Sequence, residues 1–306
     1  MCRQFYRAID SKRPSAWIVI LLSLSFPSLV YSQPLNHSSS SLLSPIQRAE
    51  FLLKESLNEE ALLLYQSLVL KDGANGYAFR GMVRAYKRMG RLDEAESWVE
   101  TYLTEKPFSS AALYASGYIF FLKEDIKKAE ELFKKALEQD DTNALALNNL
   151  GAIRLSKKSY TQAVNLVRKA IQINPKDPMF FKNLETIYKQ MGNPSLIITD
   201  YNFYLKEKED LDLIRGYGMA VGRNMRQASF RLYNKGYLEK TILKWVEIEK
   251  IYKEIDHQSG LVSVYFSLGI LYEEKGESQN AKNYFDLVLK LNPLHIQAKE
   301  RLYNIR

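Results

Sequence analysis

Residues that could perform catalysis or hold a metal ion are few and scattered in this chain of 306 residues. Its histidines are His37, His257 and His295, and its single cysteine is Cys2. A metal site needs several such ligands at characteristic spacings, and these four residues show no such spacing. The sequence also lacks a nucleophile elbow, a phosphate-binding loop and a zinc-binding helix motif. We therefore expect no enzyme activity, no metal and no cofactor.

Gly216-Tyr217-Gly218 is the stretch that most resembles part of a nucleotide-binding loop. The dinucleotide-binding fingerprint needs a third glycine, and Val221 occupies that position. It also needs a strand immediately before the first glycine, and no strand is predicted there. Nucleotide binding is therefore not predicted.

The charge balance is moderately basic, with 43 Lys and Arg against 35 Asp and Glu and a net charge of +8. The first 32 residues hold four basic residues and one acidic residue, so the remainder carries +5. This excess is dispersed among many acidic residues, whereas nucleic-acid binding requires a concentrated basic stripe. We expect no nucleic-acid partner and a mild preference for acidic partners or anionic surfaces.

The amino-terminal 32 residues have the pattern of a signal peptide. A basic segment precedes an apolar run of 11 residues, 16–26, which Pro27 ends. Val30 and Ser32 are the small residues that a signal peptidase reads. This predicts export to the periplasm or the outside of the cell, with cleavage near Ser32, and an uncleaved membrane anchor is the alternative. Residues 33–44 are serine-rich and are predicted to form a flexible tether.

A repeat of 34 residues runs through most of the chain. One alanine series and one series of larger residues keep this period: Ala61, Ala95, Ala129 and Ala163, and then Val99, Phe133, Val167 and Tyr201. Periods of 20–50 residues are typical of stacked repeat proteins. Few glycines and prolines, with many Leu, Ala, Lys and Glu, favour helices over strands. Each period is therefore predicted to be a pair of antiparallel helices.

Block 262–295 identifies the type of repeat. It contains, in order, Tyr265, Leu268-Gly269, Tyr272, Gly276, Ala281, Phe285 and Pro293. This pattern resembles the tetratricopeptide repeat family. The resemblance implies an all-α fold, a right-handed superhelical solenoid of about seven helix-turn-helix repeats that ends in a capping helix. The expected boundaries are 42–211 for repeats one to five, 222–295 for repeats six and seven, and 296–306 for the cap.

Two insertions interrupt the 34-residue phase. Ten additional residues, 212–221, follow Leu211, and six more, 256–261, follow Ile255. One interpretation is that the helices are longer at these places. The alternative is a hinge at 212–221 between repeats five and six.

The resemblance also implies where a partner would bind. In this family the first helix of each repeat lines a concave groove. The corresponding residues here are Tyr77, Arg80, Arg84, Tyr114, Tyr118, Asn148, Asn149, Lys182, Asn183, Arg223, Arg226 and Gln227. Amides can pair with a peptide backbone, cations can hold carboxylates and tyrosines provide flat contact area. The family's chaperone-tail clamp is not expected, because Thr186 occupies the position of one of its asparagines.

These features predict an exported scaffold that binds an extended segment of another protein in its groove. The alternative is a structural subunit of a cell-envelope assembly, which would act through its convex face or by self-association. Peripheral contact with a membrane and formation of a homo-oligomer remain open. The sequence does not distinguish between partners beyond the preference for acidic ones.

Overall fold

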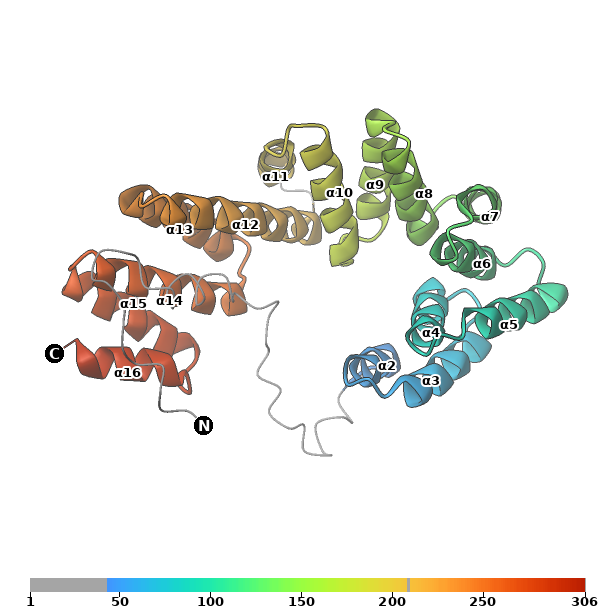
Figure 1. Ribbon diagram of the computed structural model, residues 1–306, viewed down its shortest axis with the longest axis horizontal. Helices are drawn as coiled ribbons and strands as arrows, with labels where there is room; N and C mark the ends of the chain where they lie inside the picture. Colours follow the sequence, from blue (N-terminus) through green and yellow to red (C-terminus); the bar gives the residue numbers. More distant parts are fainter. Residues whose placement is uncertain (1–42, 208–209, 306) are drawn as a thin grey trace. The chain divides into compact units, whose positions relative to one another are not determined.

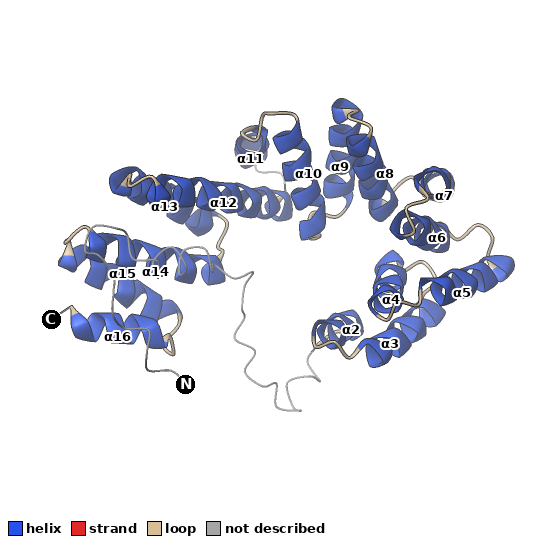
Figure 2. Ribbon diagram, in the orientation of Figure 1, coloured by secondary structure: helices blue, strands red, loops and turns tan. Residues whose placement is uncertain are grey.

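A computed structural model describes residues 43–207 and 210–305. All regular elements in these ranges are α-helices, as Figure 2 shows. The predicted signal peptide and residues 33–42 of the predicted tether lie outside the described residues. The last tether residue, Ser44, caps the first described helix, because its hydroxyl accepts a hydrogen bond from the Gln47 amide.

The described chain forms two compact units, with the boundary between Leu196 and Ile197. The first unit contains helices α2 (Pro45–Lys54), α3 (Asn58–Lys71), α4 (Gly76–Arg88), α5 (Leu92–Glu105), α6 (Ser110–Leu122), α7 (Ile126–Gln139), α8 (Ala144–Ser156), α9 (Tyr160–Ile173) and α10 (Pro178–Gln190). The second contains α11 (Leu196–Glu207), which begins at the boundary, α12 (Leu211–Asn234), α13 (Leu238–Glu254), α14 (Gln258–Glu274), α15 (Ser278–Leu291) and α16 (Ile296–Asn304). The predicted all-α helical repeat fold is confirmed.

The 34-residue period corresponds to one pair of helices and two short loops. From α4 to α10 the helices alternate between 13 and 14 residues in length. Asn75, Ser109 and Asn143, one period apart, each cap the first helix of a repeat by accepting a hydrogen bond from a backbone N–H. Such caps typically stabilise a helix by about 1 kcal/mol, so a short polar side chain, Asn or Ser, recurs where each of these repeats begins.

Small residues allow the two helices of a repeat to approach closely. Ala61, Ala95, Ala129 and Ala163 are completely buried. A Cβ atom on Gly117 would lie 2.8 Å from the Phe133 ring, and one on Gly151 would lie 2.5 Å from a Val167 methyl. A larger side chain at these positions would push the helix axes apart.

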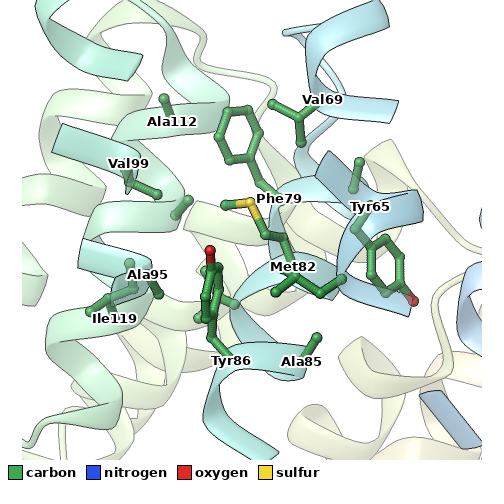
Figure 3. Packing of buried hydrophobic residues seen from close by; sticks show 14 of the residues in the cluster. Tyr65, Val69, Phe79, Met82, Ala85, Tyr86, Ala95, Val99, Ala112 and Ile119 are labelled. Carbon is green, nitrogen blue, oxygen red and sulfur yellow. The ribbon is translucent and has the colours of Figure 1, made fainter. Parts of the chain in front are cut away.

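Large apolar side chains fill the space between neighbouring repeats. Figure 3 shows Tyr65, Phe79, Met82 and Tyr86 in the core of the first unit, from helices α3 and α4. Within one repeat, the Phe79 ring of α4 and the Tyr102 ring of α5 pack edge to face at 5.3 Å between centroids. Burying a side chain such as Phe79 contributes about 2–3 kcal/mol. The repeat stack therefore has a continuous core, although each helix pair alone is too thin to bury one.

The insertion 212–221 lies inside α12, which runs without interruption for 24 residues. The C-terminal part of α13 packs closely on it. A Cβ atom on Gly218 would lie 2.8 Å from Ile255, and one on Gly222 would lie 2.3 Å from the Tyr252 ring. Residues 212–221 therefore lengthen a helix, and no break in the helix marks a hinge there. Helices α13 and α14 are also longer, at 17 residues each.

The last helix, α16, packs on α15 through Ala298. Leu302 and Ile305 are partly buried, as the apolar face of a capping helix requires. Leu294 precedes the helix and is 71% exposed. Arg301 forms an ion pair with Glu273 of α14 at 3.1 Å. No described helix combines the length and apolar composition needed to cross a membrane.

The substitution Gly269→Leu tests the close approach of α14 and α15. A Cβ atom at Gly269 would lie 2.5 Å from the buried Phe285 ring, so the larger side chain cannot fit without displacing α15. Overpacking of this kind costs about 1–3 kcal/mol, and we expect a loss in that range in urea unfolding. The matched control Ser263→Leu adds the same side chain at an exposed position of α14 and should change stability by at most about 0.5 kcal/mol. Equal effects of the two substitutions would contradict this packing.

Candidate peptide-binding face

The first helices of successive repeats in the first unit, α4, α6, α8 and α10, lie side by side. They carry the predicted groove residues of this unit. We call the surface formed by Tyr77, Arg80, Arg84, Tyr118, Asn148, Asn149, Lys182 and Asn183 the inner face. Two contacts between residues 97 positions apart show that the stack curves inward on this side, because they join α4 to the loop between α9 and α10.

An ion pair and a hydrogen bond form these long-range contacts. The Arg80 guanidinium lies 2.7 Å from the Asp177 carboxylate, whose side chain is only 3% exposed. The Asn174 amide donates to the Tyr77 hydroxyl, and the Arg80 guanidinium lies 4.7 Å from the centre of the Tyr77 ring. Burial and the nearby charge of Asp177 raise the pKa of Tyr77 to about 12. Tyr77 therefore remains a neutral hydrogen-bonding group at physiological pH.

The two groove arginines of the first unit, predicted to hold a partner's carboxylates, already hold carboxylates of this chain. Arg80 is paired with Asp177, and the Arg84 guanidinium contacts both oxygens of Glu50 on α2, at 2.7 and 3.0 Å. A partner would have to displace Asp177, which also caps α10 by accepting from the Met179 amide. In the first unit, a partner's acidic side chains therefore meet arginines that are already neutralised.

Tyr114 was also expected to contact a partner, but it is 1% exposed and belongs to the core. Its ring packs against Phe133 of α7 at 5.9 Å between centroids and stacks on Tyr118 at 6.0 Å. Burial raises the pKa of both Tyr114 and Tyr118. Tyr118 is half-buried and keeps part of its ring accessible.

Three asparagines of α8 and α10 form a chain of hydrogen bonds on the inner face. The Asn183 amide donates to the Asn148 carbonyl oxygen at 2.8 Å, and the Asn148 amide donates to the Asn149 carbonyl oxygen at 3.2 Å. The chain ends at the amide nitrogen of Asn149, which is buried and has no hydrogen-bond partner among the described residues. A buried donor without a partner costs about 1–3 kcal/mol. This nitrogen therefore has unused hydrogen-bonding capacity. Lys182, next to Asn183, is exposed.

Sequence reasoning missed Glu50, Asn174 and Asp177, which complete the inner face. Glu50 stands one period of 34 residues before Arg84, and this spacing could have indicated the pair. Asn174 and Asp177 lie in a loop, and their distance of 97 residues from Tyr77 and Arg80 is not a multiple of the period. No local sequence pattern indicates such a contact, because the contact depends on the curvature of the helix stack.

The remaining predicted groove residues lie on α12 in the second unit. Arg223 and Arg226 are half-buried and Gln227 is exposed. The histidines His257 and His295 stand at the N-caps of α14 and α16. His37 lies outside the described residues. Within residues 43–207 and 210–305, no group of His, Cys, Asp and Glu could hold a metal ion.

The substitution Asp177→Asn tests the long-range pair. Asparagine is as good an N-cap as aspartate, so the change removes the charge and retains the cap of α10. Leaving a largely buried guanidinium without its partner costs about 3–5 kcal/mol, reduced here because the Arg80 side chain keeps 21% exposure. We expect a loss of about 2 kcal/mol in urea unfolding at pH 7.

The double variant Arg80→Met and Asp177→Asn provides the control for this prediction. Without the guanidinium, Asp177→Asn should change stability by much less than in the parent chain, and the difference measures the coupling. Additive effects of the two single substitutions would show that the pair does not form.

Comparisons with known proteins agree with this architecture. Tetratricopeptide repeat families match residues 80–144, 120–182 and 262–293. Human protein O-mannosyl-transferase TMTC3 is 26% identical over 266 residues, which cover 78% of this chain and 28% of that protein. The type IV pilus assembly protein PilF of Pseudomonas aeruginosa is 30% identical over 112 residues, covering 36% of this chain and 44% of PilF. The chain thus spans less than half the length of either relative.

Among solved structures, the C-terminal part of a tetratricopeptide repeat protein from Cytophaga hutchinsonii is similar. It has 17% sequence identity and a TM-score of 0.42, and the match covers 84% of this chain and 99% of that one. The repeat pattern, the helix pairs and the three family matches lead to the same conclusion: the chain contains tetratricopeptide repeats, which the family models match over residues 80–182 and 262–293.

Proposed function

We propose that this protein is a scaffold that binds an extended segment of another protein on the inner face of its first unit. Proteins built from tetratricopeptide repeats are generally protein-interaction scaffolds, which use the long surfaces of the stacked helices. The proposal adds a location and a mode of binding to this general role.

The unpaired amide nitrogen of Asn149 is the observation that carries the proposal. Once neighbouring side chains move aside to expose this buried nitrogen, a main-chain carbonyl of a bound segment would supply the missing acceptor and remove the cost of an unpaired donor. The hydrogen bond from Asn148 holds the Asn149 side chain, and the hydrogen bond from Asn183 holds the Asn148 side chain in turn. A donor that is already oriented loses little rotamer entropy when the ligand binds.

The spacing of the helices suits an extended ligand. Packed helices lie about 8–10 Å apart, and an extended chain advances about 3.3 Å per residue. Each first helix of a repeat would therefore meet the ligand about every third residue. Asn149 on α8 and Asn183 on α10 occupy equivalent positions one period apart, with the exposed Lys182 beside Asn183. These residues provide polar contacts at the spacing that an extended main chain requires.

The proposal also includes export. Its basis is the basic segment, the apolar run 16–26 and the small residues Val30 and Ser32. The similarity to PilF, named as a pilus assembly protein, is consistent with a role at the cell envelope. The transferase named in TMTC3 is not carried over, because the chain spans 28% of that protein.

A structural role in an envelope assembly is the second candidate. Leu63 and Leu70 of α3 are both exposed and lie two turns apart on one side of the helix. An exposed apolar stripe of this kind, on the second helix of a repeat, could contact a neighbouring subunit or a second copy of the chain. This candidate predicts binding that depends on α3 and not on Asn149.

Selection from a random peptide library tests the proposed binding mode. Full-length protein is used to select twelve-residue peptides displayed on phage, and the affinity of each enriched peptide is measured for the parent chain and for Asn149→Ala. We expect about tenfold weaker binding by the variant, because one oriented hydrogen bond is worth about 1–1.5 kcal/mol. The control Asn165→Ala removes the same side chain from an exposed position on α9 and should leave affinity unchanged.

The stability of both variants is checked by thermal unfolding followed by circular dichroism. Failure to enrich any peptide, or peptides that bind parent and Asn149→Ala equally, would refute binding at the inner face. Loss of binding on Leu63→Ser and Leu70→Ser instead would support the structural candidate.

Export has its own test. After expression in a bacterium with a periplasm, we expect the mature protein in the periplasmic fraction with Gln33 as its first residue, measured by N-terminal sequencing. A chain that retains residues 1–32 in the cytoplasm would contradict export.

A further inference from the structure

A cavity of about 640 Å³ lies in the first unit where the loops between successive repeats meet. Residues from four such loops line it, those that precede α4, α6, α8 and α10. The hydrogen bond from the Asn174 amide to the Tyr77 hydroxyl joins the last of these loops to the first turn of α4. Sites for small molecules typically have volumes of about 300–1,000 Å³, so the cavity is large enough for such a ligand.

One part of the cavity wall is apolar. The Phe108 side chain, in the loop before α6, is 76% exposed, and Ile173 at the end of α9 is 38% exposed. Leu145 of α8 and Ala111 of α6 also line the cavity. An apolar ligand would cover the ring of Phe108 and the side chain of Ile173, and removing such surface from water is favourable.

Two hydrogen-bond donors, on Tyr102 and Lys106, meet at another point of the wall, beside Gly73. A Cβ atom on Gly73 would lie 2.1 Å from the Tyr102 hydroxyl oxygen and 3.7 Å from the Lys106 ammonium nitrogen. Tyr102 is only 8% exposed, and its hydroxyl has no hydrogen-bond partner among the described residues. The exposed Lys106 side chain lies over the Tyr102 ring, with its nitrogen 5.4 Å from the ring centre. It forms no ion pair with any carboxylate that the structure describes.

The electrostatic surroundings of these donors favour an anion. The first residues of α4, α6 and α8 line the cavity, and a helix N-terminus carries a partial positive charge. Among the described residues of the wall, Lys106 is the only cation and Asp140 the only carboxylate. Asp140 is held by its own loop, because it accepts hydrogen bonds from the amide and the hydroxyl of Thr142.

We propose that this cavity binds a small organic carboxylate with an aromatic or aliphatic body. The carboxylate accepts hydrogen bonds from the Lys106 ammonium and the Tyr102 hydroxyl, and the apolar body covers Phe108 and Ile173. The buried hydroxyl is uncovered when the Lys106 side chain moves from the Tyr102 ring onto the carboxylate. A charge-assisted hydrogen bond then replaces an unpaired donor.

This inference does not rest on the proposed function, because the ligand is a small molecule and Asn149 is not among the residues that line the cavity. The cavity and the inner face share Tyr77. The groups that would bind the carboxylate, Lys106 and Tyr102, do not belong to the inner face. Each proposal can therefore fail without the other.

Isothermal titration calorimetry of the full chain with 1-naphthylacetate at pH 7 tests the assignment. The matched neutral probe is 2-(1-naphthyl)ethanol, which keeps the naphthalene ring and carries an alcohol in place of the carboxylate. We expect the carboxylate to bind at least about tenfold more tightly than the alcohol, because hydrogen bonds to a charged group are stronger.

Three substitutions separate the polar contacts from the apolar one. Lys106→Met and Tyr102→Phe should each weaken binding of naphthylacetate at least about fivefold and affect the alcohol much less. Phe108→Ser should weaken binding of both probes, because both lose the same apolar contact. The control Lys87→Met removes a lysine from an exposed position near the other end of α4 and should change either affinity less than about twofold. Tyr102→Phe should not lower the unfolding temperature, because the hydroxyl that it removes has no partner.

Several outcomes would overturn the inference. These are the absence of naphthylacetate binding at about 1 mM, equal binding of the two probes, or equal effects of Lys106→Met and Lys87→Met. The variant Asn149→Ala should bind naphthylacetate like the parent chain. If library peptides bind through Asn149 while naphthylacetate fails, the proposed function stands and the cavity is not a carboxylate site.

Discussion

A small residue of one helix lying against a large residue of its partner helix is the contact on which the structure depends. Gly117 against Phe133, Gly151 against Val167 and Gly269 against Phe285 leave no room for even one additional carbon atom. Each contact sets the distance between the two helices of a repeat, and its recurrence gives successive repeats the same geometry. Helices held at fixed spacing then present their first-helix residues in register. The position of the inner face, where we propose that a partner binds, therefore follows from the packing of the core.

The curvature of the helix stack determines which side chains meet on the inner face of the first unit. The stack bends far enough for Arg80 of α4 to reach Asp177, almost three repeats later in the chain. This pair neutralises charges that would otherwise attract acidic ligands, and it leaves the asparagine chain as the group with unused hydrogen-bonding capacity.

Much of the fold could be predicted from the sequence, because the 34-residue period reflects how the helices pack and the same packing recurs in successive repeats. The spacing of the alanines at 61, 95, 129 and 163 indicates the repeat, the composition indicates that each repeat is a helix pair, and all four alanines are buried. The contacts within the candidate site were harder to predict from the sequence. Tyr114 occupies a position that faces the groove in the family pattern, yet it is buried against Phe133. The partner of Arg80 depends on the accumulated curvature of several repeats, which no single repeat encodes. For the insertion 212–221, the sequence could not distinguish a longer helix from a hinge, because both require the same additional residues.

The central claim is that Asn149 binds the main chain of a partner segment. A crystal structure of the protein with a library-selected peptide would test it most directly. Our account predicts an extended peptide across α8 and α10, with a main-chain carbonyl within about 3.2 Å of the Asn149 amide nitrogen. The hydrogen bonds among the three asparagines and the Arg80–Asp177 pair should remain in place. A peptide seated on the exposed leucines of α3, or one that displaces Asp177 and leaves Asn149 unpaired, would contradict the account.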